Sequence, residues 1–121
     1  MTQHTLHTLA DLPTDQPMPL IDRRRIMGQR MMISEVVLHP GFEVASHSHE
    51  NEQFVVMLEG RAEFTIGGQT GCDGGEKVIV SAGQVLELPP NLPHACRALE
   101  RCRILDLFSP VSEKTGVDAG S

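Results

Sequence analysis

The chain alternates apolar and polar residues over short stretches that are separated by glycine, proline and acidic turn residues. Residues 61–66, RAEFTI, are the clearest case, because Ala62, Phe64 and Ile66 fall on one face of an extended segment and polar residues on the other. Comparable runs predict further strands, at residues 30–38, 54–58, 76–80, 84–88 and 102–108, and an extended segment at 94–98. With about eight or nine short strands and no convincing amphipathic helix, the pattern predicts an all-β sandwich or barrel.

The length fits one compact domain. A chain of 121 residues buries roughly two-thirds of the surface that its unfolded form exposes, and a composition that is 40% hydrophobic supplies a core without disulfides. The first twenty residues are polar and contain Pro13, Pro17 and Pro19, which disfavour a long helix. We therefore expect an extended arm over residues 1–20 and a single domain over residues 21–121.

The stretch GFEVASHSHENEQFVVMLEG, residues 41–60, gathers side chains that suit a metal ion. His47 and His49 are separated by one residue, so both imidazoles lie on one face if the segment is extended. Gln53 follows closely enough for the chain to turn and aim its amide oxygen at the same centre, and His94 lies in a similarly framed stretch, LPPNLPHACR. Three imidazole nitrogens and one amide oxygen suit a first-row divalent metal, so we expect these four residues to bind one.

The same stretch resembles the first motif of the cupin superfamily, which places a His-x-His pair and a carboxylate between two glycines. Gly41, the histidine pair and Gly60 fit the motif's spacing, and Gln53 stands where the family most often has glutamate. The resemblance implies a divalent transition metal, and the nitrogen-rich donor set suits Fe, Ni, Mn, Zn or Cu alike. Because imidazoles and an amide are neutral, such an ion keeps its full +2 charge and acts as a stronger Lewis acid.

The second cupin motif follows later in the chain. Gly83, Pro89 and His94 fit it, whereas Asn91 replaces its second glycine and Ala98 its final asparagine. Asparagine tolerates the left-handed backbone conformation of a turn glycine, so the first replacement is mild. Two motifs in the correct order imply the cupin fold, a double-stranded β-helix or jelly roll, whose mouth would form the pocket.

Asp106 is the candidate for proton transfer. A carboxylate between Leu105 and Leu107 is costly to bury without compensation, and inside a pocket it would serve as a general acid or base. The competing interpretation is that Asp106 faces solvent or anchors a loop.

Residues 47–53, HSHENEQ, and 106–110, DLFSP, are similar to the small cupins of pectin and alginate breakdown, which linearise unsaturated uronates. The resemblance implies that Asp106 and Phe108 line the active site together with an arginine. The expected place of that arginine is occupied by Ser112.

An arginine would bind a sugar carboxylate with two parallel hydrogen bonds, so its loss bears on substrate choice. Arg61 and Lys114 are candidate replacements. Cys96 shares a face with His94 and is a further candidate for the substrate pocket, although a small buried cysteine is commonly structural.

Charge and cysteine usage narrow the possible partners. A net charge of −6 opposes binding to a phosphate backbone, and the absence of Trp and Tyr argues against base stacking. The only basic cluster, residues 23–25, RRR, is interpreted as a solvated strand edge or loop rather than an anion site.

Cys72, Cys96 and Cys102 have no C-x-x-C spacing and cannot all pair, which indicates a reduced, cytoplasmic compartment; Cys72 is expected in an exposed loop. Neither a secretory signal nor a membrane-spanning stretch is evident.

Three functional hypotheses remain open. The leading one is an enzyme that uses the metal and Asp106 to isomerise or tautomerise a small sugar acid or related carbonyl compound. The alternatives are an iron-dependent dioxygenase acting on a small molecule, and a non-catalytic module that binds a small ligand or a metal. The resemblance also leads us to expect a homodimer formed through edge strands and the N-terminal arm.

Overall fold

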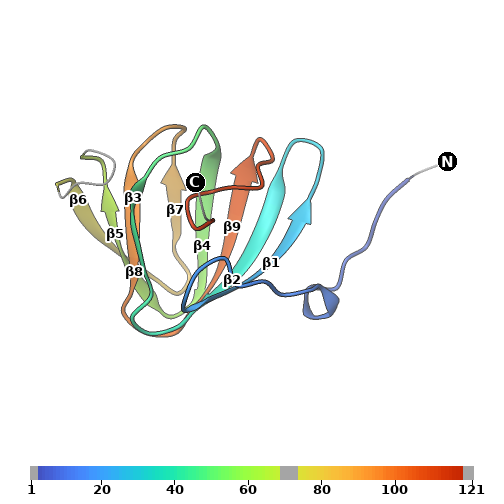
Figure 1. Cartoon of the computed structure of the whole chain (residues 1–121), viewed down its shortest axis with the longest axis horizontal. Coiled ribbons are helices and arrows are strands. Elements are labelled where there is room, and N and C mark those ends of the chain that lie inside the picture. Colours follow the sequence, from blue (N-terminus) through green and yellow to red (C-terminus); the bar gives the residue numbers. More distant parts are fainter. Residues whose placement is uncertain (1–2, 69–73, 119–121) are drawn as a thin grey trace.

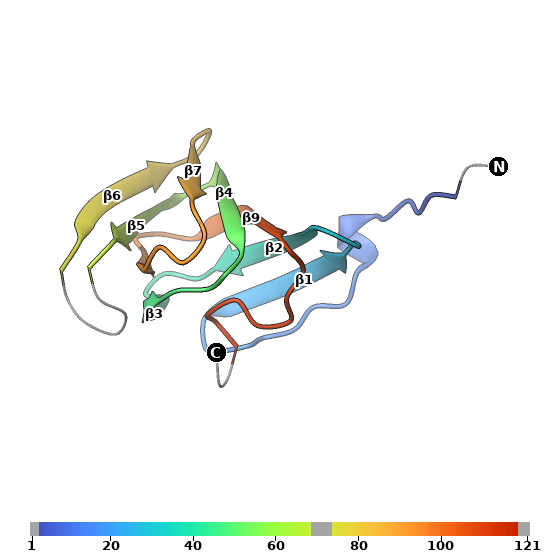
Figure 2. The ribbon, with the colours of Figure 1, turned by 90° about the horizontal axis from the view of Figure 1, so that it is seen from above.

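The computed structural model describes residues 3–68 and 74–118, in which nine strands form two antiparallel sheets. The strand order is β1-β2-β9-β4-β7 in one sheet and β3-β8-β5-β6 in the other. The strands are β1 (Ile21–Met27), β2 (Met32–Leu38), β3 (Glu43–His47), β4 (Glu52–Glu59), β5 (Arg61–Ile66), β6 (Glu76–Ser81), β7 (Val85–Leu88), β8 (His94–Ala98) and β9 (Cys102–Ser109). The two sheets face each other as in a jelly roll (Figures 1 and 2), which confirms the predicted all-β jelly-roll architecture.

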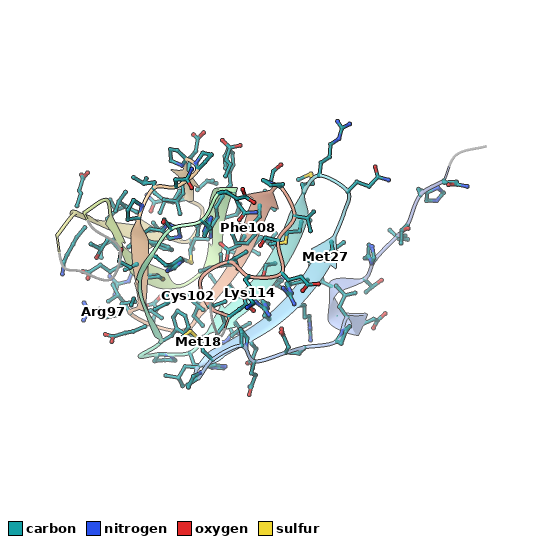
Figure 3. All side chains as sticks on the ribbon, turned by 45° about the horizontal axis from the view of Figure 1, so that its top comes forward. Met18, Met27, Arg97, Cys102, Phe108 and Lys114 are labelled. Carbon is teal, nitrogen blue, oxygen red and sulfur yellow. The ribbon has the colours of Figure 1, made fainter. Side chains whose placement is uncertain are left out.

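The apolar faces of both sheets meet in one core. In β5, Ala62 and Phe64 are buried as the alternation predicted, and in β4 the same alternation buries Val55 and Met57. Side chains fill the space between the sheets, whereas Arg97 on β8 lies outside it (Figure 3). The polar residues of the site lie directly against this core.

Two positions of the predicted motifs require a backbone that most residues avoid. Gly60 has φ of 89°, and a Cβ atom there would collide with the backbone of Arg101 and Cys102. Asn91 has φ of 65°, which confirms that it takes over the left-handed conformation of the motif's glycine. The backbone N–H of Asn91 donates to the backbone oxygen of His49 at 2.8 Å, so this turn holds the loop that carries His49.

Strand β1 was not among the strands that the sequence pattern predicted. It lies at the edge of the larger sheet and pairs with β2. Its alternation turns Ile21 and Arg23 toward the core, and Arg23 is only 3% exposed. The interpretation of residues 23–25 as a solvated edge is therefore wrong for Arg23.

The residues before β1 contain a 3₁₀ turn, η1 (Leu9–Asp11), and extend away from the sheets at their start (Figure 1). Asp15 returns to β1, where its backbone exchanges two 2.8 Å hydrogen bonds with that of Arg23. In the described part of the chain no helix has the length and apolar character to cross a membrane. Cys72 lies outside the described residues.

Candidate metal centre

Three histidines from two parts of the chain converge at one end of the space between the sheets. His47 ends β3 and His94 begins β8, and the two are direct partners in the antiparallel register. His49 lies in the loop after β3, so the loop, and not strand alternation alone, brings it to the same centre. One ring nitrogen from each histidine lies within 4.8 Å of the others. The sequence prediction that these imidazoles meet is confirmed.

The backbone fixes which nitrogen of each ring faces the centre. The Nδ1 atoms of His47, His49 and His94 lie 2.8, 3.2 and 2.9 Å from the backbone oxygens of Ala45, Asn51 and Leu92, respectively. A carbonyl oxygen only accepts hydrogen bonds, so each Nδ1 carries the proton. Each Nε2 therefore presents a lone pair, as a metal ligand requires.

Burial also favours the uncharged form of two of the imidazoles, His49 and His94. Desolvation lowers the pKa of His94 to about 4, and it lowers the pKa of His49 as well. The neighbouring His47 pushes both in the same direction. Because neutral imidazole is the form that binds metals, this environment prepares the two residues for ligation near neutral pH.

Gln53, the second residue of β4, lies between the histidines and Asp106. Its Nε2 donates to Asp106 Oδ1 at 3.0 Å, and its Oε1 consequently points to His49 Nε2 at 3.1 Å. Since the His49 proton is on Nδ1, two lone-pair atoms face each other across this short gap. A cation that both atoms ligate would relieve that repulsion, so the donor set fits a divalent transition metal.

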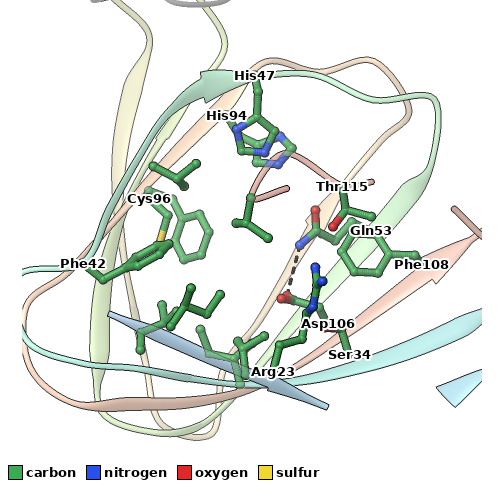
Figure 4. Close-up of a pocket in the computed structure, with 17 residues that line it drawn as sticks. Arg23, Ser34, Phe42, His47, Gln53, His94, Cys96, Asp106, Phe108 and Thr115 are labelled. Atoms are coloured by element: carbon green, nitrogen blue, oxygen red, sulfur yellow. Dashed lines mark hydrogen bonds between the residues drawn. The ribbon is translucent and has the colours of Figure 1, made fainter. Parts of the chain in front are cut away.

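Asp106 lies on β9, opposite Ser34 of β2 and Val55 of β4 in the register. The carboxyl group faces the cavity (Figure 4), so the alternative in which it points to solvent is wrong. Burial raises its pKa to about 7, and the hydrogen bond from Gln53 offsets only part of this effect. A carboxyl group with this pKa takes up and releases a proton near neutral pH.

The predicted pocket residues divide into two groups. Phe108 and Cys96 line the cavity together with Asp106, and the Phe108 ring lies edge-on to that of His49 with centroids 5.8 Å apart. Arg61 instead pairs with Glu100 at 3.5 Å on the outside of the barrel, where its side chain is 54% exposed. Lys114 is also exposed. The placement of Arg61 in the substrate pocket is therefore wrong, and neither residue replaces the missing arginine inside the cavity.

The arginine that does line the cavity is Arg23, which was not among the predicted pocket residues. The alternation in IDRRRIM offered a signal, because an inward-facing Ile21 also turns Arg23 inward. Thr115 and Val117, from the segment after β9, complete the lining and were missed as well. Nothing in the pattern of that polar tail predicts that it turns back over the cavity.

Fold and site together define a small jelly roll with three histidines positioned to bind a metal ion at one end of its cavity. The chain belongs to the cupin family, because the family model described as "Cupin domain" matches residues 34–108. No curated protein matches the chain in sequence.

Solved structures share this fold at low sequence identity. An RmlC-like cupin from Shewanella frigidimarina superimposes with a TM-score of 0.80 at 18% identity, over 92% of this chain and 95% of that one. KdgF from Halomonas sp. superimposes with a TM-score of 0.79 at 24% identity, over 90% of this chain and 97% of that one. Oxalate decarboxylase from Bacillus subtilis gives 0.76 at 22% identity over 92% of this chain, which spans 32% of that longer protein. These similarities establish the fold, and the chemistry must come from the site.

Proposed function

We propose that this cupin is a metal-dependent enzyme that isomerises or tautomerises a small sugar acid or related carbonyl compound. The observation that carries the proposal is Asp106, a carboxyl group with a pKa raised to about 7 that is linked through Gln53 to the histidine cluster. A proton-transfer residue is thus held next to a site for a Lewis acid.

Gln53 is proposed as the fourth metal ligand beside His47, His49 and His94. The ion, one of Fe, Ni, Mn, Zn or Cu, would polarise a substrate oxygen when bound. Gln53 would then have two roles at once, because its amide oxygen faces the histidines while its amide nitrogen holds Asp106. The hydrogen bond fixes the direction from which Asp106 approaches the substrate.

Asp106 moves the proton. As the carboxylate it removes a proton from carbon or from a hydroxyl group of the substrate, and as the acid it returns the proton to another atom of the same molecule. No net charge or electron leaves the substrate, so the reaction is an isomerisation. Phe108 and Cys96 supply apolar walls that keep water from competing for this proton.

The substrate class rests on motif similarity. Residues 47–53 and 106–110 resemble the cupins that linearise unsaturated uronates, and Asp106 and Phe108 both line the cavity. A uronate or similar sugar acid is therefore the first substrate to assay. A homodimer in the cytoplasm stays a prediction from the family resemblance and the cysteine usage.

Replacing Asp106 with Asn tests the proposal. We expect Asp106→Asn to lower turnover of an unsaturated uronate by about 10²- to 10⁴-fold, the usual contribution of general acid–base catalysis. Elemental analysis should find the same metal content as in the wild type. Asp11→Asn, at an exposed carboxylate, is the matched control and should keep full activity.

Other results would contradict the proposal. Equal turnover by Asp106→Asn would remove this residue from the mechanism. Oxygen uptake that depends on bound Fe(II) would favour a dioxygenase, and ligand binding without turnover over a panel of sugar acids would favour a non-catalytic binding module.

A further inference from the structure

Arg23 places a buried positive charge in the wall of the cavity (Figure 4). Its Nε and Nη2 donate to the two carboxylate oxygens of Asp15 at 3.0 and 2.6 Å. Its Nη1 lies 2.8 Å from Oδ1 of Asp118. Asp15 therefore holds the guanidinium in place by one edge. The remaining nitrogen makes no hydrogen bond within the described residues and lies beside a second carboxylate.

The second carboxylate belongs to the segment that closes the cavity, residues 115–118. This segment follows β9 and turns back toward the space between the sheets (Figure 1). Thr115 and Val117 line the cavity, and a Cβ atom on Gly116 would collide with the His47 ring. The other oxygen of Asp118 accepts a hydrogen bond from the Thr115 backbone at 3.1 Å, which keeps the segment compact. One short segment thus contacts both the arginine and a predicted metal ligand.

In this conformation the cavity is too small for the proposed substrate. Its free volume is about 60 Å³, which is enough for a few water molecules. Sites for small organic ligands usually measure roughly 300 to 1,000 Å³. A sugar acid can therefore enter only if the segment 115–118 moves away, and that movement breaks the contact between Arg23 and Asp118.

We propose that Arg23 is the residue that binds the substrate's carboxylate, and that Asp118 occupies its place while the cavity is empty. This inference rests on the proposed function in that a substrate carrying a carboxylate enters this cavity. When a substrate carboxylate replaces that of Asp118, one anion is exchanged for another and the buried guanidinium never lacks a partner. Arg23 would then supply, from β1, the arginine that the resemblance to uronate-linearising cupins leads one to expect at Ser112.

Binding of two matched sugars tests the exchange. The probes are D-galacturonate, which carries a carboxylate, and D-galactose, which is neutral and otherwise similar. Calorimetry on the full-length, metal-loaded protein should find that Asp118→Asn binds galacturonate more tightly than the wild type does, on the order of ten-fold if the segment is closed about nine-tenths of the time. Galactose binding should not change.

Two controls separate the specific contact from a general change of charge. Glu113→Gln removes an exposed carboxylate from the same tail and should leave galacturonate binding unchanged. In the Asp118→Asn background, Arg23→Gln should abolish the gain, whereas Arg61→Gln, outside the cavity, should keep it.

Three results would overturn the inference. They are the absence of a gain in Asp118→Asn, an equal gain for galactose, and a gain that survives Arg23→Gln. The first two need no Arg23 variant, so they decide the matter even if Arg23→Gln does not fold. Tighter galacturonate binding without any turnover would support the role of Arg23 and contradict the proposed function, whereas turnover without the gain would do the reverse.

Discussion

The cavity has two ends that are built in different ways. At the histidine end, each ligand comes from one of two short motifs, and a backbone carbonyl within two residues of each histidine orients its ring. At the arginine end, Asp15, Arg23 and Asp118 come from an N-terminal segment, a strand and the C-terminal tail. The spacing of residues within short motifs brings the histidine end together, whereas the arginine end depends on contacts between segments that are distant in the sequence.

Carboxylates at the two ends also differ in their proton affinity. Burial raises the pKa of Asp106 to about 7, because only the amide of Gln53 compensates its charge. The hydrogen bonds from Arg23 are the main reason that the pKa of Asp15 lies below its usual range. The same chemical group is thus suited to proton transfer at one end and to a fixed ion pair at the other.

The largest predicted effect comes from a substitution that changes only the histidine end of the cavity. His94→Ala removes one of three converging nitrogen donors, so the protein should lose its bound metal and the rise in Tm that the metal produces. That rise corresponds to about 4 kcal/mol when free metal is at roughly a thousand times its Kd. Elemental analysis and thermal unfolding with added Zn²⁺ measure both quantities.

His39→Ala is the matched control for this variant. His39 lies outside the cluster and bonds to Asp22 at 2.8 Å. It should keep the metal and its stabilisation, and metal retained by His94→Ala would show that the three histidines do not form the site.

The next prediction concerns the pH dependence of the free energy of unfolding in metal-free protein. The folded pKa of Asp106, about 7, lies above its ordinary value of 3.8. The contribution of the Asp106 carboxyl group to the free energy of unfolding is therefore fully present below pH ~4, and it is lost as pH rises toward 7. The contribution of His94 to the free energy of unfolding changes with pH in the opposite direction. Its pKa is lowered from 6.5 to about 4, so this contribution is lost as pH falls through that range.

Comparing variants separates these opposing effects. Between pH 5 and pH 8, the wild type should lose about 2.6 kcal/mol relative to Asp106→Asn, measured by urea unfolding. Asp11→Asn, at an exposed site, should change stability equally at both pH values. If the Asp106→Asn difference is also independent of pH, the carboxyl group is not held in a desolvated environment.

The contrast between the two ends explains what the sequence could predict. The fold and the histidine cluster follow from alternation, from turn residues such as Asn91 and from spacing within two motifs, all of which are short-range. Gln53 and Asp106 were identified for the same reason. The inward orientation of Arg23 was missed because three adjacent arginines have the composition of a surface edge, and the alternation with Ile21 applies only once the segment pairs with β2 as a strand. The closing segment has no periodic pattern, since its position depends on contacts with distant residues.

The smallest predicted effect involves the segment that contacts both ends. Gly116 has φ of 106°, which strains a residue with a side chain, and its Cβ would collide with the His47 ring. We expect Gly116→Ala to release the tail rather than distort the barrel, because the tail is short and lies after the last strand. The change in global stability should therefore stay below about 1 kcal/mol, whereas the Thr115 amide, which is bonded to Asp118, should exchange its hydrogen faster.

Gly74→Ala separates the steric effect from the backbone strain. Gly74 has a similar φ of 112°, but a Cβ atom there has no neighbour within 4 Å among the residues that the structure describes. Both substitutions strain the backbone, yet only Gly116→Ala should accelerate exchange at Thr115, because only Gly116 lies against the cavity. Slow exchange in both variants would mean that the tail stays in place, and the two ends of the cavity would then not be joined by a segment that can open.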